Sequence, residues 1–353
     1  MREGWGKSSI RVAASLVAIA AVAILGLAIT LALFGFDPAV ALGALWRGSL
    51  GSWYAITSAT LPRSVPLIFI GLGTTFAFRC GALNIGAEGQ FYAGAIVATA
   101  LGIHLHTVPG LLAIPLLCLG SVAGGMLWVA PAVVLKSRYG VLEVISTLLL
   151  SFVAEALVSL MVQGPLQEHG HTYPQSDQIA NSARLPLLPG TRIHLGLGFA
   201  LVLAIALWLV QSRTLWGLQF KALGTGPRAA RISGRVDPVR MTAIALLGSG
   251  ALAGLAGGVE ISGVSYALFQ NLSPGYGFTG IAVALLARLD PLAVVGTGIL
   301  FAALEAGSGA MQREAGVPSV AVYVVEAIII VLVLIGERRV HSARVVVAMD
   351  VTS

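Results

Sequence analysis

Phe78-Arg-Cys-Gly-Ala-Leu-Asn-Ile-Gly-Ala-Glu-Gly-Gln90 is the stretch that decides the fold of this chain. It places the polar side chains of Arg79, Asn84, Glu88 and Gln90 among glycines and between long apolar stretches. Polar groups are costly at membrane depth and mark a transport pathway or its support, and the glycines would interrupt a spanning helix. The stretch therefore predicts a broken helix with convergent polar groups, as in transporter sites near the membrane midplane. The alternative is a short cytoplasmic loop followed by a helix whose first turn these groups cap.

The composition predicts an all-α, polytopic membrane protein. Of the 353 residues, 57% are hydrophobic and only 10% are charged, whereas a soluble domain is about 25% charged. Apolar windows of about 20 residues predict about ten transmembrane helices. We expect them at 12–34, 54–78, 84–101, 109–133, 141–163, 195–212, 241–262, 276–288, 291–310 and 319–336. The third and eighth are the least regular, since each opens with glycines and polar residues. Both cysteines, Cys80 and Cys118, fall in or near apolar segments, and we interpret them as packing residues.

The distribution of Lys and Arg predicts the orientation of the chain. If the N-terminus is cytoplasmic, ten spans return the C-terminus to the cytoplasm, and sixteen of the 21 Lys and Arg residues fall on the inner side. Cytoplasmic loops carry such an excess, so we expect both termini to be cytoplasmic. The net charge of +6 is therefore a topology signal, and no nucleic-acid motif accompanies it.

An outer loop at about 164–194 carries His169 and His171 in a His-x-His pattern. The pattern could bind a metal weakly, but no third and fourth ligands follow at a suitable spacing. We interpret the loop as solvated and predict no metal site.

An inner loop at about 213–240 is the longest predicted cytoplasmic segment. Thr225 as a cap and Pro227 in the first turn predict the start of a short helix, and Gly234 predicts its end. This helix would present Arg228 and Arg231 on one side. The pattern favours a docking element, and an ordinary basic inner loop is the alternative.

Three segments together resemble one protein family. Phe78–Gln90 is similar to the hallmark segment of permease subunits of bacterial ABC importers. Gly224-Thr-Gly-Pro-Arg-Ala-Ala-Arg-Ile-Ser-Gly234 looks like the cytoplasmic coupling loop of that family, and Gly275-Tyr-Gly-Phe-Thr-Gly-Ile-Ala-Val-Ala-Leu-Leu-Ala287 looks like its late glycine/aromatic segment. The resemblance covers residues 50–336. It lies in the branched-chain amino acid/ribose-type superfamily, in the branch for nucleosides and simple sugars. The Leu-Asp-Pro-Leu that follows Arg288 departs from the pattern.

The resemblance implies a transport subunit, not an enzyme, that translocates nucleosides or simple sugars across a bacterial plasma (inner) membrane. The implied partners are a second ABC permease subunit, commonly a different chain, ATP-binding subunits and an extracytoplasmic substrate-binding lipoprotein, in contact with membrane lipid. We expect no cofactor on this chain and ATP on the partner subunit. The sequence agrees, because it contains no G-x-x-x-x-G-K-[ST] phosphate-binding pattern.

The resemblance also implies a single permease domain, 1–353, with two related four-helix halves. We divide it into an N-terminal helix and outer loop (1–50), a first half (51–163), an outer loop with the sixth helix and coupling loop (164–240), a second half (241–336) and a cytoplasmic tail (337–353). The interrupted third and eighth spans then hold corresponding places in the two halves. Such a pair of interruptions points to a translocation site.

Aromatic, amide and hydroxyl groups suit a nucleoside or sugar, and both halves supply them. The predicted substrate pathway comprises Asn84, Glu88, Gln90, Tyr92, Phe269, Gln270, Asn271, Tyr276 and Phe278. For the aromatic residues, anchoring at the membrane interface is the alternative. The residues predicted to couple to the ATPase are Gly224, Pro227, Arg228, Ala229, Ala230, Arg231 and Gly234.

Two other classes of protein remain as alternatives. An ion-coupled secondary transporter of small polar solutes would use membrane acids, for which the candidates are Glu88, Glu155, Glu260, Glu305 and Glu326. An intramembrane enzyme would need a nucleophile and a base at membrane depth. His104 and His106 fall in a predicted outer turn with no Ser, Cys or Asp constellation facing them, which disfavours that class.

Overall fold

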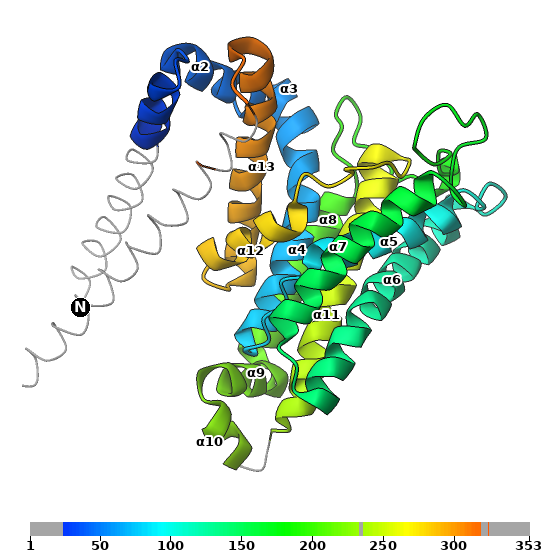
Figure 1. Cartoon of the computed structure of the whole chain (residues 1–353), viewed down its shortest axis with the longest axis vertical. Coiled ribbons are helices and arrows are strands. Elements are labelled where there is room, and N and C mark those ends of the chain that lie inside the picture. The colour runs from blue at the N-terminus through cyan, green and yellow to red at the C-terminus, as the bar shows by residue number, and fades with distance from the viewer. Residues whose placement is uncertain (1–23, 233–235, 319–323, 325–353) are drawn as a thin grey trace, which may run out of the picture. The chain divides into compact units, whose positions relative to one another are not determined.

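The structure, a computed structural model, describes residues 24–232, 236–318 and 324 (Figure 1). The described part is helical, with isolated β-bridges only. It divides into two compact units: residues 57–302 form one, and residues up to 56 together with those from 303 onward form the other. The larger unit contains the predicted site.

The larger unit is a bundle of helices joined mostly by short connections. Its helices are α4 (Leu61–Arg79), α5 (Ala87–Gly102), α6 (Gly110–Tyr139), α7 (Glu143–Val162), η2 (Asn181–Ala183), α8 (Gly196–Arg213), α9 (Leu215–Thr225), α10 (Pro227–Ile232), α11 (Pro238–Glu260), η3 (Ile261–Ser265), α12 (Tyr276–Leu286) and the first part of α13 (Pro291–Ala315). Short α3 (Trp53–Ala55) and η1 (Ile56–Thr60) lead directly into α4, and η3 extends α11.

Six described helical segments are long and apolar enough to cross a membrane. They are Trp53–Arg79, Gly110–Tyr139, Glu143–Val162, Gly196–Arg213, Pro238–Ser265 and Pro291–Ala315, and they match six of the ten predicted spans. The chain is therefore a multi-pass membrane protein. The third and eighth predicted spans appear as the shorter helices α5 and α12. The first is described only over Ile24–Leu33, and the tenth, at 319–336, lies outside the described residues except for residue 324. Ten spans in two four-helix halves stay a prediction.

Three helices begin at an Asp-Pro pair. The carboxylate of Asp37 accepts backbone N–H groups at the start of α2 (Pro38–Ser49), and Asp237 does the same for α11. Asp290 accepts from Leu292 and Ala293 at the start of α13. In each pair the aspartate caps the helix and proline fills a position whose N–H would be unpaired. The Leu-Asp-Pro-Leu departure is thus the start of a helix, and α2 adds a helix within the segment predicted as an outer loop.

Glycines bring α5, α6 and α11 into backbone contact. A Cβ atom on Gly94 of α5 would lie 2.1 Å from the carbonyl oxygen of Gly254 of α11. A Cβ on Gly125 of α6 would lie 2.1 Å from the carbonyl oxygen of Gly250 of α11. Small residues permit this approach, which supplies the packing that holds membrane helices together. The three helices therefore form a tightly fitted core.

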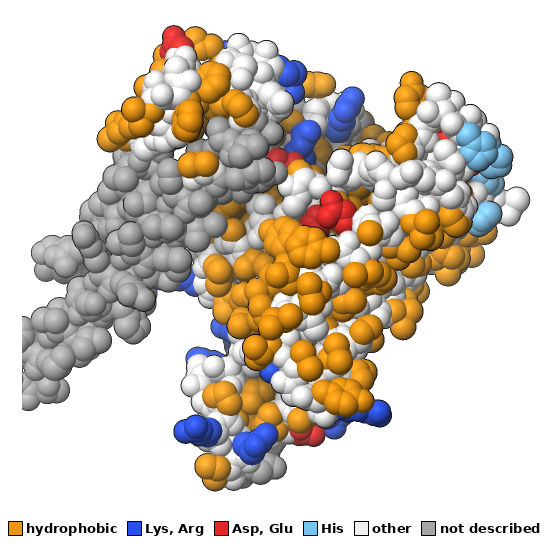
Figure 2. Space-filling model, viewed as in Figure 1, with side chains coloured by type: hydrophobic (Ala, Val, Ile, Leu, Met, Phe, Trp, Pro, Cys, Tyr) orange, Lys and Arg blue, Asp and Glu red, His pale blue; other side chains and the backbone are white. Residues whose placement is uncertain are grey.

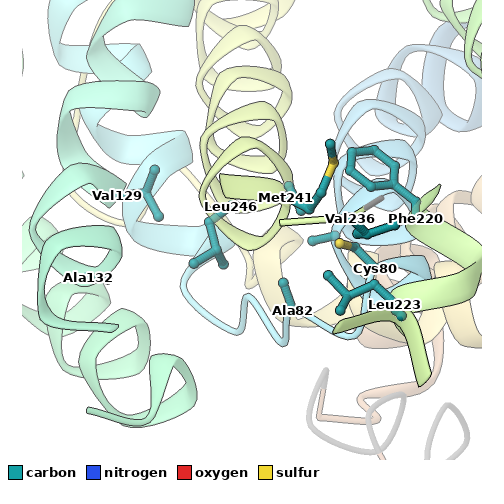
Figure 3. Close-up of a cluster of buried hydrophobic side chains, with 12 residues drawn as sticks. Cys80, Ala82, Val129, Ala132, Phe220, Leu223, Val236, Met241 and Leu246 are labelled. Carbon is teal, nitrogen blue, oxygen red and sulfur yellow. The ribbon is translucent and has the colours of Figure 1, made fainter. Parts of the chain in front are cut away.

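Helices α9 and α10 lie at one end of the bundle, here termed the α9 end (Figure 1). Buried Phe220 and Leu223 of α9 and Ala230 of α10 join one apolar cluster with Cys80 and Met241. Figure 3 shows Phe220, Leu223, Cys80 and Met241 beside one another. The predicted packing role of Cys80 is thus confirmed.

The predicted short helix is present as α10, with Pro227 at its first position. Thr225 does not cap it, contrary to the sequence prediction. Thr225 is the last residue of α9, and its hydroxyl donates back to the Lys221 carbonyl at 2.8 Å. The predicted stop, Gly234, lies outside the described residues.

The connection between α7 and α8 folds over the opposite end of the bundle, here termed the loop end. Its backbone pairs with the segment after η3: Ser176 N–H donates to Leu268 at 2.8 Å and Ile179 N–H donates to Tyr266 at 2.9 Å. His194 is buried in the same region, where burial lowers its pKa to about 4. The histidine is therefore neutral at pH 7, and this part of the loop is packed rather than fully solvated. Other parts are exposed, among them 169–174 and 186–190, and in the first of these stretches His169 contacts Asp177.

The smaller unit has its own apolar cluster. Leu27, Ala41 and Met311 are among its buried residues. Arg47 and Glu314 form an exposed ion pair at 2.6 Å.

The two ends of the bundle should lie on opposite sides of the membrane. In a chain lacking Cys80 and Cys118, we expect Thr172→Cys at the loop end to react with an impermeant thiol reagent on intact cells. Lys221→Cys on α9 should react only after lysis, because the positive-inside rule places the basic loop in the cytoplasm. Thr172 and Lys221 are both exposed, so burial shields neither position from the reagent. Ser176→Cys serves as a protected control, because Ser176 is buried in the same loop. Labelling of Lys221→Cys on intact cells would contradict this orientation.

Candidate translocation site

The predicted break lies between α4 and α5. Helix α4 ends in a Schellman motif: Gly81 adopts φ +79°, its N–H donates to Phe78, and Ala82 N–H donates to Ala77. Residues 82–86 then run without helix, and α5 begins at Ala87. Ala82, Asn84 and Gly86 of this segment and the first turn of α5 are buried, whereas Leu83 is exposed. The structure thus has the interrupted helix that the glycines predict.

One face of α7 hydrogen-bonds the backbone of the break. Glu143, Thr147 and Ser151, spaced four residues apart, accept from the N–H groups of Leu83 at 3.5 Å, Ile85 at 3.3 Å and Gly89 at 3.2 Å. Four-residue spacing places the three side chains along one stripe of the helix. Unpaired N–H groups are too costly to leave inside a membrane, so this stripe stabilises the broken conformation.

Lys136 of α6 supports the end of the stripe. Its ammonium nitrogen lies 2.6 Å from the carboxylate of Glu143. This pair also ties the end of α6 to the start of α7.

Asn84 and Gln90 pair with each other behind the break. The Asn84 amide nitrogen donates to the Gln90 oxygen at 2.8 Å, and the Gln90 nitrogen donates back at 2.9 Å. Asn84 also donates to Ser249 of α11 at 2.9 Å and accepts from Gly86 N–H at 3.1 Å. Both amides are buried. In this conformation their polar atoms are therefore occupied within the protein.

Glu88 links the starting turns of α5 and α12. Its carboxylate accepts the N–H of Gly277, in the first turn of α12, at 2.5 Å. A Cβ on Gly277 would lie 2.2 Å from the Glu88 nitrogen, so glycine is required for this approach. The residue before α5 provides no side-chain cap for that helix. Glu88, in the first turn of α5, caps the other interrupted helix, α12. A carboxylate is favourable here because helix N-termini carry partial positive charge.

A pocket opens beside this contact. It is lined by Tyr92, Glu155, Val158, Ser159, Gln270 and Asn271 and has a volume of about 170 Å³. The Gln270 amide donates to Ser159 at 2.6 Å. Three predicted pathway residues, Tyr92, Gln270 and Asn271, thus share one pocket. Glu155, Val158 and Ser159 of α7 complete it and were not part of the predicted pathway.

The predicted aromatic residues are divided between core and surface. The Tyr276 ring packs edge-on against Phe91, with centroids 5.8 Å apart, and Phe91 contacts Tyr92 in the same manner at 5.7 Å. Phe269 and Phe278 are exposed. Tyr276, Phe91 and Tyr92 form a packed aromatic group next to the pocket. Phe269 and Phe278 are not among the residues that line it.

The α9 end reaches the break directly. A Cβ on Gly224 of α9 would lie 2.3 Å from the carbonyl oxygen of Arg79, at the turn that ends α4. The Arg79 side chain also donates to Gln211 of α8. On α10, Arg228, Ala229 and Arg231 are exposed and Ala230 is buried. The α9–α10 pair thus presents basic residues outward and contacts the end of α4 inward.

A multi-pass helical protein with two interrupted helices meeting beside a polar pocket has the architecture of a solute permease. The chain belongs to the family of the branched-chain amino acid transport system permease component, whose model matches residues 56–334. It is therefore the permease subunit of an ABC transporter, a transport component and not an enzyme. Membership supports ATP-driven import over the ion-coupled alternative, with ATP bound by a partner subunit.

Several relatives match nearly the whole chain. The glucose ABC transporter permease protein TsgB13 of Haloferax volcanii is 34% identical over 95% of this chain and 90% of its own. The guanosine ABC transporter permease protein NupP of Bacillus subtilis is 35% identical over 88% of this chain and 90% of its own. The nucleoside ABC transporter permease protein NupB of Lactococcus lactis is 30% identical over 97% of this chain and 96% of its own.

Gly277→Ala should separate α5 from α12. The added methyl overlaps the Glu88 backbone, and overpacking of this kind costs about 1–3 kcal/mol. We expect a lower midpoint of thermal unfolding in detergent and reduced transport. Gly296→Ala is the matched control, because nothing lies within 4 Å of its added Cβ. Equal unfolding midpoints for the two variants would contradict the close contact.

Glu88→Gln should lower transport by about tenfold, which corresponds to about 1.4 kcal/mol on the barrier. Glutamine keeps an oxygen for Gly277 but removes the charge that favours both helix starts. Uptake normalised to permease in the membrane measures the effect. Asn84→Ala should act similarly, because it leaves Gln90 and Gly86 without their partner. Wild-type uptake by both variants would move the site away from the break.

Proposed function

We propose that this chain translocates nucleosides or simple sugars, delivered by an extracytoplasmic substrate-binding lipoprotein, through an importer in the bacterial plasma membrane. It would pair with a second permease subunit and dock on ATP-binding subunits in the cytoplasm. The observation that carries the proposal is the pocket: it offers amide, hydroxyl, carboxylate and aromatic groups and no basic side chain. These groups suit neutral, hydroxyl-rich solutes, and the relatives are named for guanosine, nucleosides and glucose.

The proposed pathway runs past the junction of α5 and α12. Tyr92, Gln270 and Asn271 contribute from the pocket, while exposed Phe269 and Phe278 would contact solute or the second permease. Asn84, Glu88, Gln90 and Tyr276 would hold the pathway in shape from behind. This arrangement is supported by their burial and mutual contacts.

The proposed coupling begins at α10. Arg228 and Arg231 would contact the ATPase, with Pro227, Ala229 and Gly234 shaping the docking segment. Movement of α10 would reach α9 through the apolar cluster around Ala230. Gly224 would then transmit it to Arg79, because the two backbones have no space between them.

The break converts that movement into a change at the pathway. Gly81 lies only seven residues before Glu88, and the intervening segment is held by side-chain hydrogen bonds rather than by a continuous helix. Such bonds contribute about 0.5–1.5 kcal/mol each, so a few can rearrange without unfolding the core. ATP-driven closure would thereby favour one set of contacts over another, as alternating access requires.

Arg228→Glu with Arg231→Glu should abolish coupling. In proteoliposomes that contain the complete importer, we expect ATP-dependent uptake of radiolabelled guanosine or glucose by the wild type. The double variant should lose uptake and substrate-stimulated ATP hydrolysis at normal permease abundance, because two charges on the docking face are reversed.

The matched control is Arg138→Glu with Arg240→Glu, which reverses two exposed charges at the same end. It should retain at least about half of the wild-type uptake, since surface substitutions away from contacts have small effects. Unchanged coupled hydrolysis in the Arg228/Arg231 variant would make α10 a passive connection. Absence of uptake of either solute by the wild type would contradict the proposed substrates.

A further inference from the structure

Glu155 is an exposed carboxylate inside a spanning helix. It is the thirteenth of the 20 residues of α7 and is flanked on the helix surface by exposed Phe152, Val153 and Leu160. Figure 2 shows an acidic patch beside α7, bordered by apolar and uncharged side chains. No hydrogen bond or ion pair engages Glu155 among the described residues. A lone charge facing lipid is costly, so this side of α7 must face water or a polar ligand.

The opposite wall of the pocket is held rigidly. Ser176 N–H donates to Leu268, and an isolated bridge joins Gln175 to Phe269. These bonds fix the segment that carries Gln270 and Asn271. Asn271 adopts φ +58°, a left-handed conformation that asparagine tolerates better than most residues. Its amide has no hydrogen-bond partner among the described residues. Two polar groups from different elements, Glu155 and Asn271, therefore line one pocket with bonding capacity unused.

The pocket is rich in acceptors and has an apolar floor. Glu155 offers two carboxylate oxygens, and carboxylates accept hydrogen bonds roughly twice as strong as those of neutral acceptors. Tyr92 and Val158 are buried and supply an aromatic and aliphatic surface. A carboxylate above an apolar floor matches a sugar ring, whose hydroxyls donate from its edge and whose C–H groups pack on its face.

We propose that Glu155 determines specificity by accepting hydrogen bonds from two neighbouring hydroxyl groups of the solute, with Asn271 bonding a third polar atom. The ligand class is a vicinal diol, as in the ribose of a nucleoside or in a hexose. This inference rests on the proposed function and names the part of the solute that the pocket contacts. A metal cation is the less suitable occupant, because hard cations take six or more oxygen ligands and the lining offers one carboxylate.

The test compares each solute with an analogue that lacks one hydroxyl. The complete importer is reconstituted, and uptake is measured for guanosine against 2′-deoxyguanosine and for glucose against 2-deoxyglucose. We expect the wild type to prefer the diol of the pair it transports by about tenfold or more, since a charged hydrogen bond is lost with the analogue. Glu155→Gln should lower uptake of the diol by about tenfold and bring the ratio of the two rates close to one. The binding protein is identical in all assays, so a change in the ratio arises in the permease.

Two controls separate this role from a structural one. Glu314→Gln removes an exposed carboxylate outside the pocket and should leave the ratio unchanged. Glu155→Asp should restore part of the preference. An unchanged ratio in Glu155→Gln with normal uptake overturns the inference and leaves the proposed function standing. Uptake that depends on sodium in the wild type and not in Glu155→Gln assigns the site to a cation and also overturns it. Uptake of neither parent solute by the wild type overturns both proposals.

Discussion

Backbone N–H groups that are freed by a break in a membrane helix must find acceptors inside the protein, because lipid offers none. This constraint organises the region around residues 82–89. Glu143, Thr147 and Ser151 receive the N–H groups on one side, Asn84 receives that of Gly86, and Glu88 serves the first turn of α12. Several elements are therefore fixed in place by one short irregular segment. Loss of a single acceptor leaves its N–H donor unpaired, since lipid offers no replacement.

Close glycine packing restricts where the bundle can change shape. Helix α5 cannot slide freely against α11, because Gly94 and Gly257 bring its backbone against that helix with no room for a methyl group. Packed helix interfaces of this kind switch between discrete arrangements rather than deform continuously. Within the break, Gly86 makes one such contact, since its Cβ would lie 2.4 Å from the carbonyl oxygen of Thr147. The other residues of the break are held by individual hydrogen bonds rather than by a continuous helix.

The sequence predicted much of this arrangement from local patterns. Six spans followed from apolar windows, and the broken helix followed from Gly81, Gly86 and the polar residues between them. Helix α2 was missed although Asp37-Pro38 is a start signal that recurs at Asp237-Pro238 and Asp290-Pro291. Thr225 was misassigned, because a threonine that ends one helix cannot be distinguished by type from one that begins the next.

Other features needed the folded chain. The stripe of Glu143, Thr147 and Ser151 has a four-residue spacing that the sequence displays, but its partners in the break and at the start of α5 are not encoded locally. Glu88 resembled a cap for its own helix, yet its acceptor oxygen serves Gly277, 189 residues away. Glu155 looked like a candidate for ion coupling. Only its position opposite Gln270 and Asn271 makes a polar pocket apparent.

Chain segments from both ends of the bundle lead to the contact between Glu88 and Gly277. From the α9 end, the Arg79–Gly81 turn leads into the break and to Glu88. From the loop end, the segment paired with Ser176 and Ile179 leads to Gly277. A carboxylate shared between two helix starts responds to displacement of either, because its stabilisation falls off within one turn. On the proposed mechanism, binding-protein contacts at one end and ATPase contacts at the other would bias the same pair of residues. Coupling between distant sites requires such an element with two arrangements that both ends can favour.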